Sequence, residues 1–508
     1  MVCNEELLES LVMPEQFGQY GRLRFWEIVP GFLAWSTILL AIFASFFAPV
    51  IAVVFIIIFD LYWTLRVLYF LVHTIFAYKQ YQQTVHHDWQ TEVQKFENWE
   101  RIYHVVMLPT YKEDISILRH ALKSLSETKY RSDRFIVVLG GEEGDEQNFL
   151  EYKKILSKEF ADKFKKLMFT VHPKGLPGEM AGKGSNMRWM AKEVRPIINE
   201  MHLPYENILV SAFDVDTIAH EQYFARLTYL FLTVENPLRA SYQPLTLFSN
   251  NIWYATAPVR ISAFGTTFWL LTELVREERM WTFSSHSMPW QMLVDVGYHE
   301  ADLVSEDSRI FLQGLIHYDG DYRVVPMFIP VHMDAVEGET YFESLKALYK
   351  QQRRWAWGVE HLPYMIEQFR KHPELPRSVK FKFLFNHIEG MYTWATAPML
   401  IFMLGYLPFF VAGDSPTAII ANSPFALERM MQVATIGVFA SGIMSFLFLP
   451  KRPGEVGKHN WLIMIAQWGL LPITFILFGA IPAIDAQTRF MLGTYLGFNV
   501  TEKKTKEQ

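Results

Sequence analysis

The feature that most constrains this chain is a run without a charged residue, which covers residues 28–59. As a single helix the run would be roughly 48 Å long, whereas the hydrocarbon core of a membrane is about 30 Å thick. The run must therefore break, and the proline in FFAPV (residues 46–50) offers a place for a tight turn. The sequence predicts two membrane-spanning helices, at about residues 30–47 and 50–72.

The charges around this hairpin indicate its orientation. Arg22 and Arg24 precede the first span and Lys79 follows the second, so both ends are predicted to be cytoplasmic. Asp60 would lie near the middle of the bilayer, where an ionisable residue is a functional candidate by default. A hydrogen bond inside the helix bundle explains Asp60 equally well. The first residues, MVCNEELLES, carry acids where a secretory signal carries bases, so no cleaved targeting peptide is expected.

Hydrophobic character returns beyond Lys382, where three further spans are predicted at residues 388–411, 430–449 and 461–483. The connection KRPGEVGKH between the last two is basic and is therefore predicted to be cytoplasmic. Five spans would place the tail TEKKTKEQ outside, while its lysines favour the inside. Either the last apolar region re-enters the membrane or the positive-inside rule fails there.

The middle of the chain, from about Trp99 to Lys382, is polar and mixed. Apolar runs that end in polar residues recur in RIYHVVMLPTYKED, RFIVVLGGEEGDE, LMFTVHP and NILVSAFDVD, and ISILRHALKSLSET has helical spacing. This alternation predicts an open, mostly parallel α/β sheet whose ligand lies at the carboxyl ends of the strands. The net charge of −6 gives no case for nucleic-acid binding. The single cysteine, Cys3, excludes an internal disulfide framework.

Four regions follow from these patterns. Residues 1–80 form an N-terminal region with a two-helix transmembrane hairpin, and residues 99–340 form the α/β domain. Residues 341–380 form amphipathic interface helices, and residues 384–508 form a C-terminal transmembrane region with a tail.

Three constellations in the middle region carry potential chemistry. In FDVDTIAH, Asp214 and Asp216 follow a buried strand, and side chains one residue apart on an extended chain face the same side. Such a pair suits a hard cation that bridges a nucleotide diphosphate, Mg²⁺ or Mn²⁺. In VSEDSRIF, Glu306 and Asp307 either complement a helix dipole or supply a carboxylate that takes a proton from an attacking hydroxyl.

The third constellation is KQQRRWAWG, in which Gln351, Arg354 and Trp355 are spaced as Q-x-x-R-W. An arginine–aromatic cluster beside membrane spans is usually an anchor at the membrane surface. The planar fork of an arginine can also hold two phosphate oxygens at once. The amphipathic stretch around it allows both roles, with an apolar side in the interface and an arginine at the active site.

Together and in this order, D-x-D, E-D and Q-x-x-R-W resemble the processive membrane glycosyltransferases of family 2, the cellulose, chitin and hyaluronan synthases. The resemblance covers about residues 103–358 and the arrangement of spans around them. It implies a GT-A type cytoplasmic domain inserted between transmembrane helices. It also implies a multi-pass protein of the plasma (inner) membrane, in contact with membrane lipids.

The resemblance implies roles for individual residues. In LPTYKED, which resembles a P-x-Y-x-E turn, Thr110, Tyr111 and Glu113 would contact the nucleotide. In AGKGSNMRW, Lys183 would approach the diphosphate. The remaining roles are nucleotide contact for Asp214, metal binding for Asp216, general base for Asp307 beside Glu306, diphosphate contact for Gln351 and Arg354, and acceptor contact for Trp355.

Two departures from the family pattern matter. Members commonly carry an Asp-Asp pair after the second strand, whereas here Gly140 and Gly141 are followed by Glu142 and Glu143. We expect the longer side chain of Glu142 to reach the nucleotide from its later position. A small-residue F-x-C-G segment is replaced by FSSHSMPWQMLVDVG, in which His286 either shapes the acceptor pocket or is a structural hydrogen-bonder.

The function implied is an inverting transfer of a sugar from a nucleotide-diphosphate donor, a UDP-sugar most readily, to a growing β-linked polysaccharide. Export across the membrane would accompany the transfer. Two alternatives stay open: a transferase that moves one sugar onto a polyprenyl phosphate lipid, and a catalytically degenerate transporter or scaffold.

Overall fold

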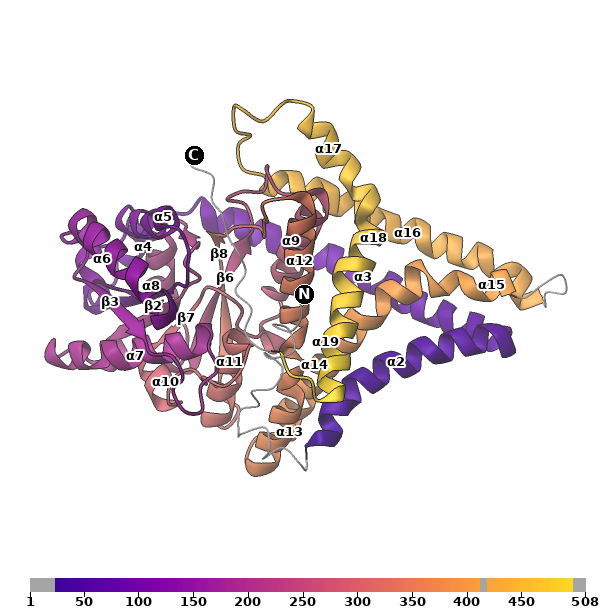
Figure 1. Cartoon of the computed structure of the whole chain (residues 1–508), viewed down its shortest axis with the longest axis horizontal. Helices are drawn as coiled ribbons and strands as arrows, with labels where there is room; N and C mark the ends of the chain where they lie inside the picture. Colours follow the sequence, from indigo (N-terminus) through magenta and orange to yellow (C-terminus); the bar gives the residue numbers. More distant parts are fainter. Residues whose placement is uncertain (1–22, 412–417, 497–508) are drawn as a thin grey trace, which may run out of the picture.

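The computed structural model describes residues 23–411 and 418–496 of the chain. The N-terminal MVCNEELLES and the tail TEKKTKEQ lie outside these residues, and so do the predictions made for them. An α/β domain forms one side of the molecule, and long helices extend from it on the other side (Figure 1).

The α/β domain is built on one eight-stranded sheet in the order β3-β2-β1-β4-β7-β6-β8-β5. The first four strands are parallel: β3 (Lys166–His172), β2 (Phe135–Glu142), β1 (Tyr103–Pro109) and β4 (Ile208–Ala212). The others are β7 (His286–Pro289), β6 (Ala240–Leu247), β8 (Arg323–His332) and β5 (Ile218–Ala219). β7 is antiparallel to both β4 and β6, and β5 is antiparallel to β8, while β6 and β8 are parallel. The predicted α/β fold is confirmed: six of the eight strands run in the same direction, and only β7 and β5 oppose them, so the sheet is mixed but mostly parallel.

Helices cover both faces of the sheet because its strands are apolar on both sides. Val105 and Met107 of β1 pack into one core with α7 (Lys183–Glu200), α10 (Trp290–Asp295) and α11 (Glu306–His317). Val106 and Leu108 of the same strand pack into a second core with α5 (Ile115–Ser126), α6 (Glu146–Phe160) and α8 (Tyr223–Thr233). This alternation follows from the two-residue period of an extended chain.

The long helices have the lengths and compositions of membrane spans. α2 (Arg24–Phe47) and α3 (Pro49–Val85) meet at Ala48, and Pro49, where the sequence predicts the break, opens α3. α3 continues to Val85 because its last turns join the α/β domain, where Ala77, Tyr78 and Tyr81 pack against the first core. The short α4 (Trp89–Val93) follows.

The C-terminal region contains two further candidate spans. α16 (Ala418–Phe448) is one, and the other is a broken helical run made of α17 (Asn460–Ala466), α18 (Leu471–Phe475) and α19 (Ile481–Leu492). α14 (Arg377–Phe402) bends by 47° into α15 (Leu407–Val411). The described part of the chain therefore has four helices that can cross a membrane, or five if the bent pair is one span. The chain is a membrane protein.

Between the domain and these spans lie α9 (Ala257–Glu273), α12 (Tyr341–Ala356) and α13 (His361–Lys371). α12 begins with a capping box in which Thr340 and Glu343 each accept a hydrogen bond from the other's backbone N–H. It packs against α19 and α9, so that it connects the domain to the membrane helices (Figure 1).

Candidate active site

One continuous cavity of about 1360 Å³ extends from the carboxyl ends of β1, β2 and β4 to the membrane helices α3, α14 and α16. Parallel strands of an α/β sheet place their ligands at this edge. The cavity is lined by all the predicted site residues except Asp216 and His286, namely Thr110, Tyr111, Glu113, Glu142, Lys183, Asp214, Glu306, Asp307, Gln351, Arg354 and Trp355.

The turn after β1 is fixed by its own side chains. Glu113 accepts a hydrogen bond from the Thr110 hydroxyl at 2.7 Å and another from the backbone N–H of Tyr111. The Thr110 N–H donates to the Gly140 carbonyl at 2.8 Å, which ties the end of β1 to the end of β2. The sequence LPTYKED thus forms one wall of the cavity.

Glu142 at the end of β2 is held by a histidine that the sequence analysis did not single out. His172 ends β3 opposite Glu142, and its Nδ1 lies 2.9 Å from Glu142 Oε2 while its Nε2 lies 2.9 Å from Glu179 Oε2. Asn186 donates to the other Glu142 oxygen at 2.8 Å. Both ring nitrogens face carboxylates, so both carry protons. Burial opposes the charge, but the bonds to Glu142 and Glu179 outweigh it and raise the pKa of His172.

The position of His172 could have been found from sequence. Strands β2 and β3 are parallel neighbours, and the residue that ends each of them lies at the same edge of the sheet. A search for polar residues at the ends of all the predicted strands would therefore have paired Glu142 with His172.

At the centre of the cavity an ammonium group joins the two acidic motifs. Lys183, the first residue of α7, places its Nζ 2.7 Å from Asp214 Oδ1, 2.9 Å from Asp307 Oδ1 and 3.8 Å from Glu306 Oε1. Burial alone would lower the pKa of Lys183, but these carboxylates outweigh it and raise that pKa. The D-x-D and E-D motifs are about 90 residues apart in sequence, and both contact the same ammonium group of Lys183.

Glu306 and Asp307 open α11, and their environments differ. The side chain of Glu306 is 5% exposed and that of Asp307 is 24% exposed. Burial, followed by the nearby charge of Asp307, raises the pKa of Glu306 and favours its neutral form. Asp307 is thus the carboxylate with better access to an incoming hydroxyl.

Asp216 and His286 lie beside the cavity rather than on its wall. Asp216 accepts a hydrogen bond from the backbone N–H of Asp334 at 3.0 Å, and Asp334 does line the cavity. His286 is fully buried in β7, with its Nδ1 bonded to the Phe283 carbonyl at 2.9 Å. His286 thus makes a structural hydrogen bond, one of the two alternatives that the sequence left open for it. Ser284, which bonds Asp214 at 2.6 Å, is the residue of this segment that faces the cavity.

The adjacent arginines of QQRRW point to different partners, because successive residues of a helix are about 100° apart around its axis. Arg353 bonds Asp485 of α19 at 3.0 Å, whereas Arg354 lines the cavity with Gln351 and Trp355. One arginine thus anchors α12 to a membrane helix and the other belongs to the site.

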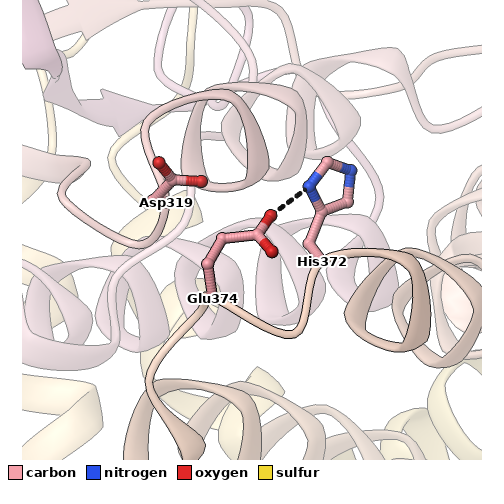
Figure 2. Close-up of side chains that lie close together, drawn as sticks. All are labelled: Asp319, His372 and Glu374. Atoms are coloured by element: carbon pink, nitrogen blue, oxygen red, sulfur yellow. Dashed lines mark hydrogen bonds and ion pairs between the residues drawn. The ribbon is translucent and has the colours of Figure 1, made fainter.

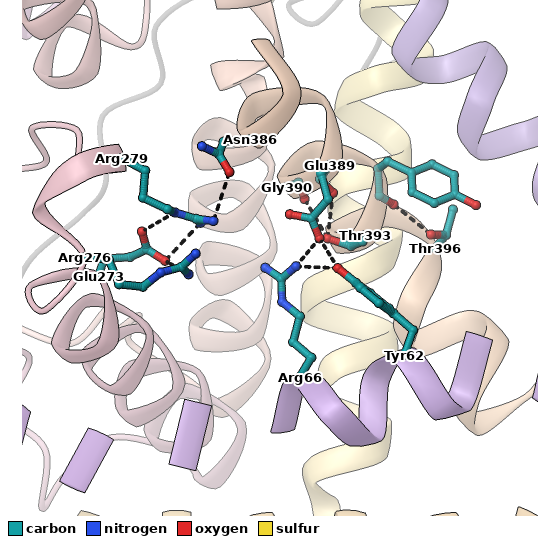
Figure 3. Close-up of polar contacts among 11 residues, drawn as sticks. Tyr62, Arg66, Glu273, Arg276, Arg279, Asn386, Glu389, Gly390, Thr393 and Thr396 are labelled. Atoms are coloured by element: carbon teal, nitrogen blue, oxygen red, sulfur yellow. Dashed lines mark hydrogen bonds and ion pairs between the residues drawn. The ribbon is translucent and has the colours of Figure 1, made fainter. Parts of the chain in front are cut away.

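The membrane half of the cavity contains two groups of ion pairs, which meet at α14 (Figure 3). Arg66 of α3 bonds Tyr62 at 2.6 Å and also pairs with Glu389 of α14. Across from it, Arg279 bonds Glu273 at 3.1 Å and Asn386 of α14 at 3.1 Å.

Several residues that line this half each have a buried polar atom without a hydrogen-bond partner among the described residues. These atoms are Asp60 Oδ1, Trp63 Nε1, His387 Nε2 and Trp468 Nε1. Buried polar atoms normally have partners, so these four atoms are exceptions in the fold. These positions are spread over three helical segments, and of the four only Asp60 was singled out from the sequence.

A separate group of side chains has the spacing of metal ligands. Asp319, His372 and Glu374 place one ligand atom each within 4.8 Å of one another (Figure 2). Asp319 follows α11, and the other two residues lie between α13 and α14, away from the cavity lining. Within residues 23–411 and 418–496 the D-x-D carboxylates do not form such a three-ligand group.

Comparisons with known proteins bear on the same region. Residues 209–447 match the family model described as Glycosyl transferase family group 2. The matched range contains the D-x-D, E-D and Q-x-x-R-W motifs. No curated protein matches the sequence.

Two solved structures are similar to this chain at low identity. One is the mannosyltransferase PcManGT from Pyrobaculum calidifontis in complex with GDP-Man and Mn²⁺ (14% identity, TM-score 0.39, 80% of this chain and 99% of that chain). The other is S. aureus TarS 1-349 in complex with UDP-GlcNAc (12% identity, TM-score 0.35, 78% of this chain and 94% of that chain). TM-scores below 0.5 add nothing to the family match.

Proposed function

We propose that this family 2 glycosyltransferase extends a β-linked polysaccharide from a nucleotide-diphosphate sugar and passes the product into its membrane helices. The observation that carries the proposal is the continuity of the cavity, which joins Asp307 and Arg354 to α3 and α14 without a wall between them. A transferase that releases a short soluble product has no need of a cavity that enters the membrane region.

The donor would occupy the sheet end of the cavity. Thr110, Tyr111, Glu113 and Glu142 would surround the nucleoside, since they line the wall formed by the ends of β1 and β2. Lys183, Arg354 and Gln351 would contact the diphosphate. A UDP-sugar is the first donor to test.

The transfer itself requires one proton acceptor and stabilisation of the leaving group. Asp307 would take the proton of an acceptor hydroxyl, whose oxygen attacks the anomeric carbon while the bond from that carbon to the diphosphate oxygen breaks. Attack from the face opposite the leaving group converts an α-linked donor into a β-linkage. Arg354 and Lys183 would stabilise the charge on the departing diphosphate.

A divalent cation fits the donor set of this site. Asp214 already binds a positive charge, the Lys183 ammonium at 2.7 Å. We infer that Asp216 and Asp214 would hold Mg²⁺ or Mn²⁺, which would supply positive charge to the diphosphate oxygens.

The acceptor would extend from Trp355 into the membrane half of the cavity. Trp63, Trp394 and Trp468 line that half, and so do the polar residues Asp60 and His387, which would contact the hydroxyls of a sugar chain. The basic connection KRPGEVGKH favours a cytoplasmic position for the α/β domain. The resemblance to the family 2 synthases favours the plasma membrane.

A second candidate is transfer of one sugar to a polyprenyl phosphate. Arg66 and Arg279, which line the membrane half, are the observation that favours it, because guanidinium groups bind phosphate. Membrane lipid would then provide the acceptor.

The test is a panel of UDP- and GDP-sugars with the purified full chain in lipid nanodiscs, with nucleoside diphosphate release and product length as readouts. We expect release with at least one UDP-sugar and a ladder of saccharides. A single lipid-linked sugar would select the second candidate. Absence of release with every donor would overturn both and favour a degenerate scaffold.

A further inference from the structure

Glu360 and His361, which follow Q-x-x-R-W, contact the start of α11, the helix whose first turn contains the proposed base Asp307. We infer that Glu360 and His361 are positioning residues that hold the first turn of α11, and with it Asp307, at a fixed place relative to Arg354. The inference rests on the proposed function, because it takes Asp307 as the base.

Glu360 binds the backbone at the start of α11. The first N–H groups of a helix have no partner within the helix, and Ser305, which precedes α11, makes no side-chain cap. Glu360 Oε1 accepts the Ser305 N–H at 3.0 Å, and its Oε2 accepts Trp357 Nε1 at 3.0 Å. Glu360 is only 7% exposed, so both oxygens are committed to this junction.

His361 holds the next turn through side chains. Its Nδ1 accepts a hydrogen bond from Arg309 Nε at 3.2 Å, so its Nε2 carries the proton and donates to the Ser308 hydroxyl at 2.7 Å. Arg309 also bonds Glu300 at 2.6 Å and lies 3.7 Å from the ring centroid of Tyr364 of α13. Ser308 and Arg309 are the two residues after Asp307. The helix turn that carries the base is therefore bonded to α13 through these two neighbours.

The segment between Arg354 and the two positioning residues is short. Trp357–Glu360 is a 3₁₀ turn that joins α12 directly to α13, and Arg354 lies in the last turn of α12. A segment of eight residues, 354–361, therefore contains the diphosphate contact and both groups that hold the base helix. Loss of either group would let Asp307 shift, while every side chain proposed to bind the donor would still be present. A misplacement of about 1 Å can cost on the order of 100-fold in rate.

Glu360→Gln tests this arrangement at nearly constant size. The amide NH₂ would face either the Ser305 N–H or Trp357 Nε1, both of which are donors. We expect turnover to fall about 10- to 100-fold, with the affinity for the UDP-sugar of highest turnover unchanged in calorimetry. The matched control is Glu367→Gln, a carboxylate further along in α13 that pairs with Arg370 and Lys371, and it should leave turnover unchanged.

A double-mutant cycle separates positioning from a general loss of structure. If Glu360 acts through Asp307, Glu360→Gln should lower turnover in the wild type and have no effect on the residual turnover of Asp307→Asn. An equal loss in both backgrounds, or no loss in the wild type, would overturn the inference. Full turnover by Asp307→Asn alone would instead overturn the assignment of the base.

A milder variant covers the case in which Glu360→Gln does not fold. Ser308→Ala removes only the hydroxyl that His361 contacts. It should lower turnover several-fold in the wild type and leave Asp307→Asn unaffected. An equal effect in both backgrounds would again overturn the inference.

Discussion

At the scale of single residues, the roles of a base and a binding group separate in kinetics. Asp307→Asn keeps the size of the side chain and removes the proton acceptor, so donor affinity should persist while turnover falls about 10²- to 10⁴-fold. Calorimetry with the donor and diphosphate release at saturating donor measure the two quantities. If the variant binds donor poorly yet turns over normally at saturation, Glu306 becomes the better candidate for the base.

The pH dependence of stability reports on His172. Its folded pKa is raised above the unfolded value, which is about 6.5 for histidine. Its contribution to stability is therefore complete below that pH and is lost as the pH rises through the folded pKa. We expect the thermal midpoint of the wild type to fall relative to that of His172→Gln as the pH is raised from about 6.5. Parallel curves for the two proteins would show that His172 is not charged between Glu142 and Glu179.

At the scale of elements, the last turn of α12 directs two neighbouring arginines, Arg353 and Arg354, to different partners. Arg354→Gln should weaken donor binding, because this side chain lines the cavity beside Trp355. Arg353→Gln should leave donor binding unchanged and cost about 0–1 kcal/mol of stability, since the pair with Asp485 is partly exposed. Asp485 also keeps its bonds to Tyr349 and Arg489. Equal losses of donor affinity in the two variants would contradict this division.

The strands that could be predicted are those whose apolar runs end in polar residues. β1, β2, β3 and β4 are such runs, and their common edge brings Glu142 and Asp214 to the site. Two strands of the other half of the sheet, β5 and β7, could not be predicted in the same way. β5 has two residues, and β7 is a four-residue strand that pairs with β4 and β6 in the antiparallel sense. Short strands carry too little periodicity to show their direction.

At the scale of the whole molecule, the limit on prediction is the packing of distant segments. The helical hairpin follows from length alone, because the charge-free run exceeds the thickness of a membrane. The cavity depends on α3, α9, α14 and α16, which are spread over residues 49–448 of the chain. Pairs such as Arg66 with Glu389 form only when these helices are packed together, so no local sequence pattern predicts them.

Gly390, in the middle of α14, is a position from which a new side chain would enter this cavity. It lines the membrane half, it lies beside the Arg66–Glu389 pair (Figure 3), and a Cβ placed on it would meet no heavy atom within 4 Å. A large side chain can therefore occupy the cavity at this point without a clash at its Cβ. Gly454, in the loop between α16 and α17, is equally open and lies off the cavity, which makes it the matched control.

If the product passes between α3 and α14, Gly390→Trp should shorten the saccharides or lower their yield. Hydrolysis of the donor by water should persist, because Gly390→Trp changes none of the residues proposed to bind the donor or to act as the base. Gly454→Trp should change neither quantity. Product length on a sizing gel and diphosphate release without acceptor measure the two effects separately. Saccharides of wild-type length and yield from Gly390→Trp would mean that the product leaves by another path, while the transfer chemistry at Asp307 would stand.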